Sequence, residues 1–137
     1  MHKYRHFFTN YKFNIYINNK FIAKITYLCD IMEEQTRLNI EENIVKMLKT
    51  VFDPEIPVDV YNLGLIYNID VQDSGHVRID MTLTAPSCPA SEFLMEDIRM
   101  KVESVEGVKS LDVQLVFEPE WDKDMMSDEA KLELGFL

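Results

Sequence analysis

The residue best suited to bind a metal or to react in this 137-residue sequence is Cys88, which lies between two prolines, Pro86 and Pro89. Proline is favoured at the first position of a helix, so Pro89 predicts a helix start that places Cys88 at the N-cap. The partial positive charge of a helix N-terminus stabilises a thiolate, which is the form of cysteine that binds metal or attacks an electrophile. Cys88 is therefore a candidate metal ligand, although the competing interpretation is that a free cysteine simply packs in the core.

Other polar residues could reach the same place. Thr84 lies four positions before Cys88, where its hydroxyl could hydrogen-bond a sulfur or a bound ligand. Asp53 and Glu55 follow the first predicted helix at the same end of the predicted sheet, and carboxylates near a cysteine can complete a metal site. Their competing interpretation is a helix-terminating Asp-Pro turn, which the residues alone favour. The chain has only two cysteines, so a zinc or cluster site made of four cysteines within one chain is excluded.

Alternating and helical patterns of apolar residues predict the elements that must position these side chains. Asn39 predicts a helix N-cap, and Pro54 and Pro57 predict the end of that helix. Gly75 predicts the turn of an antiparallel hairpin. The predicted elements are a helix over 39–52, strands over 63–71 and 77–83, a helix over 89–106, a strand over 111–117 and a helix over 127–135. This order predicts an α+β two-layer sandwich, α-β-β-α-β, with both helices on one face of a small sheet and a short C-terminal helix.

Composition excludes several classes of function. The formal net charge of -10 disfavours binding to nucleic acid phosphates, which requires clustered Lys and Arg. No stretch approaches the roughly 20 apolar residues of a membrane span. The two cysteines lack a secretory signal, so we expect a cytoplasmic protein without a disulfide framework.

Residues 1–31 differ in composition from the rest. They hold five Lys and Arg against one acidic residue, whereas the remainder holds nine Lys and Arg against 23 Asp and Glu. The segment could form an extra strand or hairpin, since Phe13, Ile15 and Ile17 alternate, or a basic amphipathic arm. We favour a third interpretation, a translated leader of a gene whose true start is Met32. The predicted organisation is a non-domain leader over 1–31, a domain over 32–120 and a tail with a short helix over 121–137.

Three ordered blocks of the chain carry a resemblance to a known family. They are Asp53-Pro-Glu-Ile-Pro-Val-Asp-Val-Tyr-Asn-Leu-Gly-Leu-Ile-Tyr67, Met81-Thr-Leu-Thr-Ala-Pro-Ser-Cys-Pro89 and Glu118-Pro-Glu-Trp-Asp-Lys-Asp-Met-Met-Ser127. Over about residues 38–137 the chain resembles the SufT-like iron–sulfur cluster assembly family, which also includes PaaD and the eukaryotic cytosolic iron–sulfur targeting subunit. Ala85 departs from the second threonine of many relatives. The chain also lacks the additional C-terminal cysteines of PaaD-type proteins.

The resemblance implies a factor that helps iron–sulfur clusters reach client apoproteins alongside Suf-type assembly proteins. It places the family's acidic pair on Asp53 and Glu55, its threonine on Thr84 and its cysteine on Cys88. The leading hypothesis is a non-enzymatic maturation factor in which Cys88 transiently ligates iron or a cluster edge, with no stably bound cofactor. One cysteine supplies too few soft ligands for a stable cluster, so ligation would be shared across a homodimer or with a client.

Two alternatives stay open. The first is a metal-free adaptor that bridges an assembly scaffold and its clients, with Trp121, Met125 and Met126 as contacts, since aromatic and Met side chains are enriched at interfaces. Trp121 is predicted to be exposed in this case, and ordinary packing of the tail is its competing interpretation. The second is a cysteine-nucleophile enzyme, which the sequence disfavours because no histidine is placed to act as a base.

Overall fold

The computed structural model describes residues 19–86 and 89–137, and the chain divides into two compact units, Met1–Met32 and Glu33–Leu137. Helix α1 (Asn19–Leu48) begins in the first unit, and every later element belongs to the second. The predicted helix start at Asn39 is wrong, because residues 19–38 contain no Gly or Pro to stop the helix and Asn39 lies inside it. The possible extra strand at residues 13–17 falls outside the residues that the structure describes.

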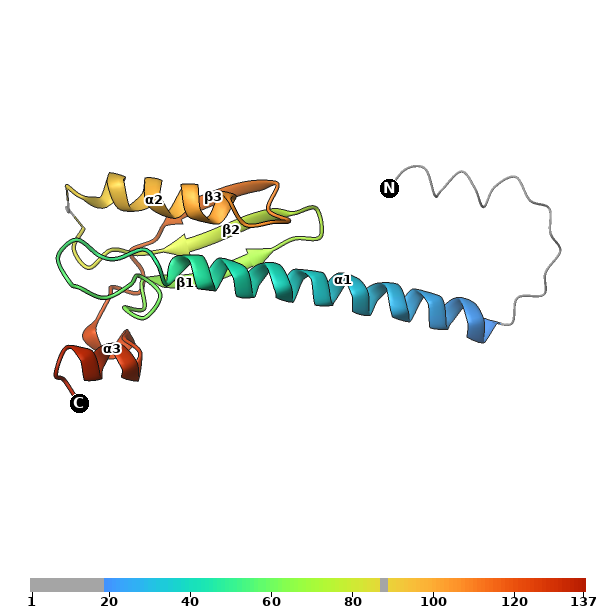
Figure 1. Cartoon of the computed structure of the whole chain (residues 1–137), viewed down its shortest axis with the longest axis horizontal. Helices are drawn as coiled ribbons and strands as arrows, with labels where there is room; N and C mark the ends of the chain where they lie inside the picture. Colours follow the sequence, from blue (N-terminus) through green and yellow to red (C-terminus); the bar gives the residue numbers. More distant parts are fainter. Residues whose placement is uncertain (1–18, 87–88) are drawn as a thin grey trace. The chain divides into compact units, whose positions relative to one another are not determined.

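The sheet has three strands, β1 (Ile66–Val71), β2 (His76–Met81) and β3 (Ser110–Leu115). Figure 1 shows β2 between the other two; β1 pairs with it antiparallel and β3 pairs with it parallel. The predicted hairpin is confirmed, and Gly75 has a φ of 84° in its turn, a conformation that glycine adopts without strain. β1 and β3 are therefore the two edges of this sheet.

The start of β1 differs from the prediction. In the sequence, Leu63 and Leu65 continue the apolar alternation of the strand. In the structure they are fully buried, but they lie in the turn before β1 and not in the strand. Gly64 between them has a φ of 75°, and a side chain there would collide with the backbone carbonyl of Met125. Gly64 therefore permits a close approach between this turn and the backbone of the C-terminal tail. The register also shifts between Ile66 and Asn68, as at a β-bulge, which a simple alternating pattern cannot anticipate.

Both helices pack on one face of the sheet, and α2 (Ser91–Glu103) connects β2 to β3. The buried residues form one cluster: Ile40, Ile44 and Leu48 of α1, Leu94, Ile98 and Val102 of α2, and Val71, Val77, Ile79, Met81 and Val113 of the sheet. The alternate residues of β2, Arg78 and Asp80, lie on the opposite, wetter face. The predicted α+β fold of order α-β-β-α-β is confirmed.

The start of α2 corrects the prediction for Cys88. The residue at the N-cap position is Ala90, and the Ala90 carbonyl accepts the first helical hydrogen bond from Leu94 at 3.0 Å. Pro89 therefore lies in a turn before the helix and not at its first position. The fixed φ of proline suits a turn as well as a helix start, so a proline alone does not locate the first helical residue. The expected N-cap position of Cys88 is wrong.

The C-terminal tail is packed against the core. A 3-10 turn, η1 (Lys123–Met125), precedes α3 (Asp128–Glu133), and Ser127 caps α3 by accepting a hydrogen bond from the amide of Ala130 at 3.2 Å. Met126 and Ala130 are 5% and 1% exposed and belong to the core cluster. The predicted short C-terminal helix is confirmed. None of the helices in the described part of the chain is long and apolar enough to cross a membrane.

Candidate functional site at the loop before α2

The loop between β2 and α2 carries two of the predicted site residues. It starts with Thr82, which is only 1% exposed, and continues through Thr84, which is partly buried. Ser87 and Cys88 lie outside the described residues, and the described chain resumes at the turn before α2. Thr84 is thus fixed close to the covered end of the sheet, on the same loop as Cys88.

The acidic turn after α1 holds the other two predicted residues. Asp53 is 8% exposed, and its Oδ1 accepts hydrogen bonds from the backbone amides of Glu55 and Ile56, both at 2.9 Å. This is the local bonding pattern of an aspartate that stabilises its own turn. Glu55 lies on the surface of that turn. Asp53 therefore has a structural role, as the competing interpretation expected, and Glu55 is the more accessible carboxylate.

One cavity joins this acidic turn to the start of α2. Its volume is about 260 Å³. It is lined by Phe52, Pro54, Ala90, Phe93, Leu94 and Asp97. Pro54 lies between the two predicted carboxylates, and Ala90 lies two positions after Cys88. The structure therefore brings the acidic turn and the chain next to Cys88 to the same end of the domain. We call this cavity the Phe93 groove.

Two exposed aromatic residues of the Phe93 groove were missed by the sequence analysis. Phe93 is 81% exposed and Phe52 is 60% exposed. Phe93 directly precedes Leu94, the first residue of the buried stripe of α2, so it falls off that stripe by one position. A large apolar side chain beside a helix's buried stripe was the signal that could have identified it. Exposed aromatic side chains of this kind are common anchors in protein interfaces.

A lysine connects the two sides of this region. The Nζ of Lys101, on α2, donates a hydrogen bond to the carbonyl of Thr50 at 2.9 Å and lies 3.1 Å from a carboxylate oxygen of Asp97. Thr50 follows the end of α1 and precedes the acidic turn. The contact therefore ties α2 to the segment that carries Asp53, which helps to maintain the shape of the Phe93 groove.

Comparisons with known proteins identify the family. A model of the iron–sulfur cluster assembly protein family matches residues 41–115, a range that contains the acidic turn and Cys88. The chain belongs to this family. It is 68% identical over 100 residues to a protein of Porphyromonas gingivalis named Fe-S protein maturation auxiliary factor, a match that covers 73% of this chain and 95% of the relative.

Further relatives agree with this assignment to the iron–sulfur cluster assembly family. The Staphylococcus aureus protein named Fe-S protein maturation auxiliary factor SufT is 39% identical over 85 residues, which are 62% of this chain and 97% of the relative. The crystal structure of a domain of unknown function from Bacillus anthracis matches with a TM-score of 0.70 at 31% identity, covering 76% of this chain and 99% of that chain. The resemblance to SufT-like proteins is confirmed, and so is the fold.

Within residues 19–86 and 89–137, no three His, Cys, Asp or Glu side chains lie close enough together to hold a metal ion. Cys88 lies outside those residues, and its role as a metal ligand stays a prediction. The second cysteine, Cys29, is an exposed free thiol on α1. It provides a natural comparison for Cys88, because both belong to the same chain and only one lies in the region that matches the family.

The residues proposed for a metal-free adaptor are mostly occupied in packing. Trp121 is partly buried and donates a hydrogen bond from its indole nitrogen to the carbonyl of Leu63 at 2.8 Å, so its predicted exposure is wrong. Met126 is buried in the core. The sulfur of Met125 accepts a hydrogen bond from the hydroxyl of Tyr67 at 3.5 Å. These three residues therefore stabilise the fold, and Phe93, at 81% exposed, is the more accessible aromatic side chain.

Proposed function

We propose that this chain is an iron–sulfur protein maturation factor that assists cluster assembly or delivery to client apoproteins. Family membership and the names of its relatives support this role. The observation that carries it is the Phe93 groove, which Pro54 of the acidic turn and Ala90 beside the Cys88 loop line together. A reactive residue adjoining an apolar docking surface is what a protein needs to hand a cluster to a client.

In this proposal the Cys88 thiolate is a transient ligand for iron or for a cluster edge, which is the substrate and not a resident cofactor. Thiolates are the preferred ligands of iron–sulfur clusters. Glu55 and Thr84 assist from the neighbouring turn and loop, and Asp53 holds the turn. Because one thiolate cannot retain a cluster alone, the remaining ligands come from a client, an assembly protein or a second copy. The protein has no catalytic cycle of its own and works with Suf-type proteins in the reducing cytoplasm, where the thiol stays free.

Anaerobic reconstitution tests the role of Cys88. The full chain is incubated with ferrous iron and sulfide, and bound iron and visible absorption are compared for wild type, Cys88→Ser and Cys29→Ser. We expect the chromophore and most of the bound iron to be lost in Cys88→Ser and retained in Cys29→Ser. Equal iron in all three proteins would contradict direct metal handling.

A metal-free adaptor is the second candidate, because Phe93 is 81% exposed on the groove that Ala90, two positions after Cys88, also lines. This version needs the aromatic surface but not the thiol. If Cys88→Ser binds a purified Suf-type scaffold normally and supports cluster loading of clients in cells, while Phe93→Ser does neither, the adaptor hypothesis replaces the metal-handling one. Phe136→Ser is the matched control, since Phe136 is also an exposed phenylalanine, at 55%, and does not line the Phe93 groove.

A further inference from the structure

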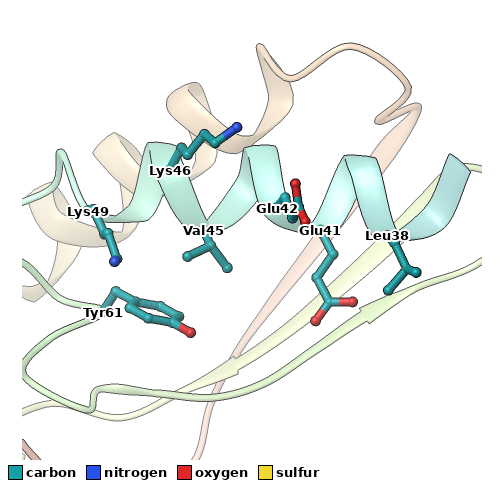
Figure 2. A pocket seen from close by; sticks show the side chains of 7 residues that line it. All are labelled: Leu38, Glu41, Glu42, Val45, Lys46, Lys49 and Tyr61. Atoms are coloured by element: carbon teal, nitrogen blue, oxygen red, sulfur yellow. The ribbon is translucent and has the colours of Figure 1, made fainter. Parts of the chain in front are cut away.

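A second groove runs along the outer flank of α1 beside β1, away from the Phe93 groove. It consists of three adjoining cavities of about 440, 230 and 230 Å³. Glu41 lines all three, and Leu38, Val45 and Tyr61 each line two of them. Figure 2 shows Leu38, Glu41 and Val45 extending from the same flank of α1, with Tyr61 beneath Lys49. We call this surface the β1 groove. It shares no lining residue with the Phe93 groove.

One wall of the β1 groove is the free edge of a strand. β1 pairs with β2 on one side, and no described strand pairs with its other side. The amide of Gln72 bonds back to His76, so alternation points the N–H and C=O groups of Ile69 and Val71 toward the free edge. Proteins usually protect such an edge with Lys, Pro or a bulge; the bulge of β1 lies between Ile66 and Asn68, and residues 68–71 contain no Lys or Pro. The edge is therefore open to pairing with another extended segment.

The side chains of the β1 groove define what could bind there. Its floor is apolar and accessible: Leu38 is 49% exposed, and Ile66 and Ile69 are partly buried. The two cavities that border β1 contain three carboxylates, Glu34, Glu41 and Asp70, and one cation, Arg37. Arg37 already lies 3.2 Å from a carboxylate oxygen of Asp73. The part of the groove next to the strand is therefore apolar at its floor and acidic at its rim, whereas Lys46 and Lys49 line the cavity that no residue of β1 borders.

We propose that the β1 groove binds an extended segment of a partner protein in which apolar residues alternate with Lys or Arg. The segment pairs with β1 as a fourth strand, its apolar side chains cover the floor, and its cations face Glu41 and Asp70. Strand addition of this kind takes its affinity from main-chain hydrogen bonds and its specificity from alternate side chains. A second copy that pairs its β1 with this β1 is a poor occupant, because the symmetric contact would bring Glu41 and Asp70 of both copies together.

The probe for this proposal is a blocked six-residue peptide of alternating valine and lysine. We expect it to bind the full chain and to slow hydrogen exchange at the amides of Ile69 and Val71, measured by NMR. The same peptide with all of its backbone amides N-methylated keeps its charge but has no amide hydrogen to donate to β1 from either edge. We expect it to bind at least about tenfold more weakly, since strand addition depends on those bonds. Equal binding of the two peptides would show a purely electrostatic contact and would overturn the proposal.

Charge reversal in the protein locates the site. Glu41→Lys should weaken binding of the valine–lysine peptide about tenfold and strengthen binding of a valine–glutamate peptide, because opposite charges select partners across an interface. Glu129→Lys, at an exposed position of α3, is the matched control and should leave both affinities unchanged. Equal losses in both variants would contradict the assignment. Light scattering provides a second check. If the wild type is a dimer and Glu41→Lys is a monomer, the occupant of the groove is a second copy of the chain, and the proposal is wrong.

Discussion

The Phe93 groove and the β1 groove offer different features to a partner. The Phe93 groove presents two exposed aromatic side chains next to the loop that carries Cys88. The β1 groove presents an unpaired strand edge, an apolar floor and carboxylates. Side chains dominate the first surface and backbone dominates the second. The two proposals above assign these surfaces to separable contacts, one close to the proposed metal ligand and one that holds a partner without contributing a reactive group.

The largest expected effect separates chemistry from docking. Cys88→Ser should lower the affinity for ferrous iron by about 100-fold, because replacing a thiolate ligand is at least as damaging as losing the groups that support one. Anaerobic titration monitored by absorbance measures this affinity. Binding of the valine–lysine peptide to the β1 groove should not change. A Cys29→Ser variant with the same loss of iron affinity would show that the effect is not specific to Cys88.

A somewhat smaller effect is expected at the aromatic surface. Phe93→Ser should weaken binding to a purified Suf-type scaffold by about 30-fold, the factor that corresponds to an interface anchor worth about 2 kcal/mol. Phe93 is 81% exposed, so the free energy of unfolding should not fall. Calorimetric titration measures the binding, with Phe136→Ser as control. An undiminished affinity would remove the Phe93 groove as the docking surface.

Asp53 distinguishes structural support from a direct role in the site. Asp53→Ala removes the acceptor of two backbone amides and should lower the free energy of unfolding by about 2 kcal/mol, as for other buried groups that lose a charged partner. Asp53→Asn keeps an oxygen acceptor and should recover most of this loss. Urea unfolding measures both variants. If Asp53→Asn is stable but binds iron as weakly as Cys88→Ser, the carboxylate itself belongs to the metal site.

The tail gives a smaller effect that should leave both grooves unchanged. Ser127→Ala removes the N-cap of α3 and should cost about 1 kcal/mol in urea unfolding. Ser127→Thr keeps the capping oxygen and the hydroxyl that donates to the side-chain oxygen of Asn62, and should restore the stability. Peptide binding at β1 and scaffold binding at Phe93 should be the same in all three proteins. A change in either affinity would show that the tail communicates with a groove.

The smallest effect concerns the link across the Phe93 groove. Lys101→Met removes the hydrogen bond to Thr50 and the contact with Asp97, both partly exposed, and should cost only about 0.5 kcal/mol. Scaffold affinity should fall slightly if Lys101 maintains the shape of the groove. Lys109→Met, at an exposed position outside both grooves, is the control. Identical scaffold affinities for the two variants would make Lys101 irrelevant to docking.

Much of the fold could be predicted because its signals are local. The alternation of Val77, Ile79 and Met81 marks β2, and the spacing of Leu94, Ile98 and Val102 marks the buried face of α2. Helix starts were harder, since Asn39 and Pro89 are residue types that fit more than one backbone position. A residue type that favours a helix N-cap marks the start of a helix only where the residues before it do not themselves form a helix.

The candidate site was less predictable than the fold. The proximity of the acidic turn to the start of α2 follows from the predicted order of elements, and the Phe93 groove supports it. The packing of Trp121 was not predictable, because its hydrogen-bond partner, Leu63, is 58 positions away in the chain. The β1 groove depends on which strand lies at the edge of the sheet, and alternation within one strand contains no such information.

The burial of Met126 and Ala130 in the core affects how the protein is made. Both residues are translated after every other member of the buried cluster, so the core stays incomplete until the ribosome has passed Ala130. Earlier segments can form the hairpin and α2, but they expose apolar surface that only the tail covers. A prematurely terminated chain would therefore be a substrate for chaperones and proteases, and only chains with an intact tail would reach the state that presents both grooves.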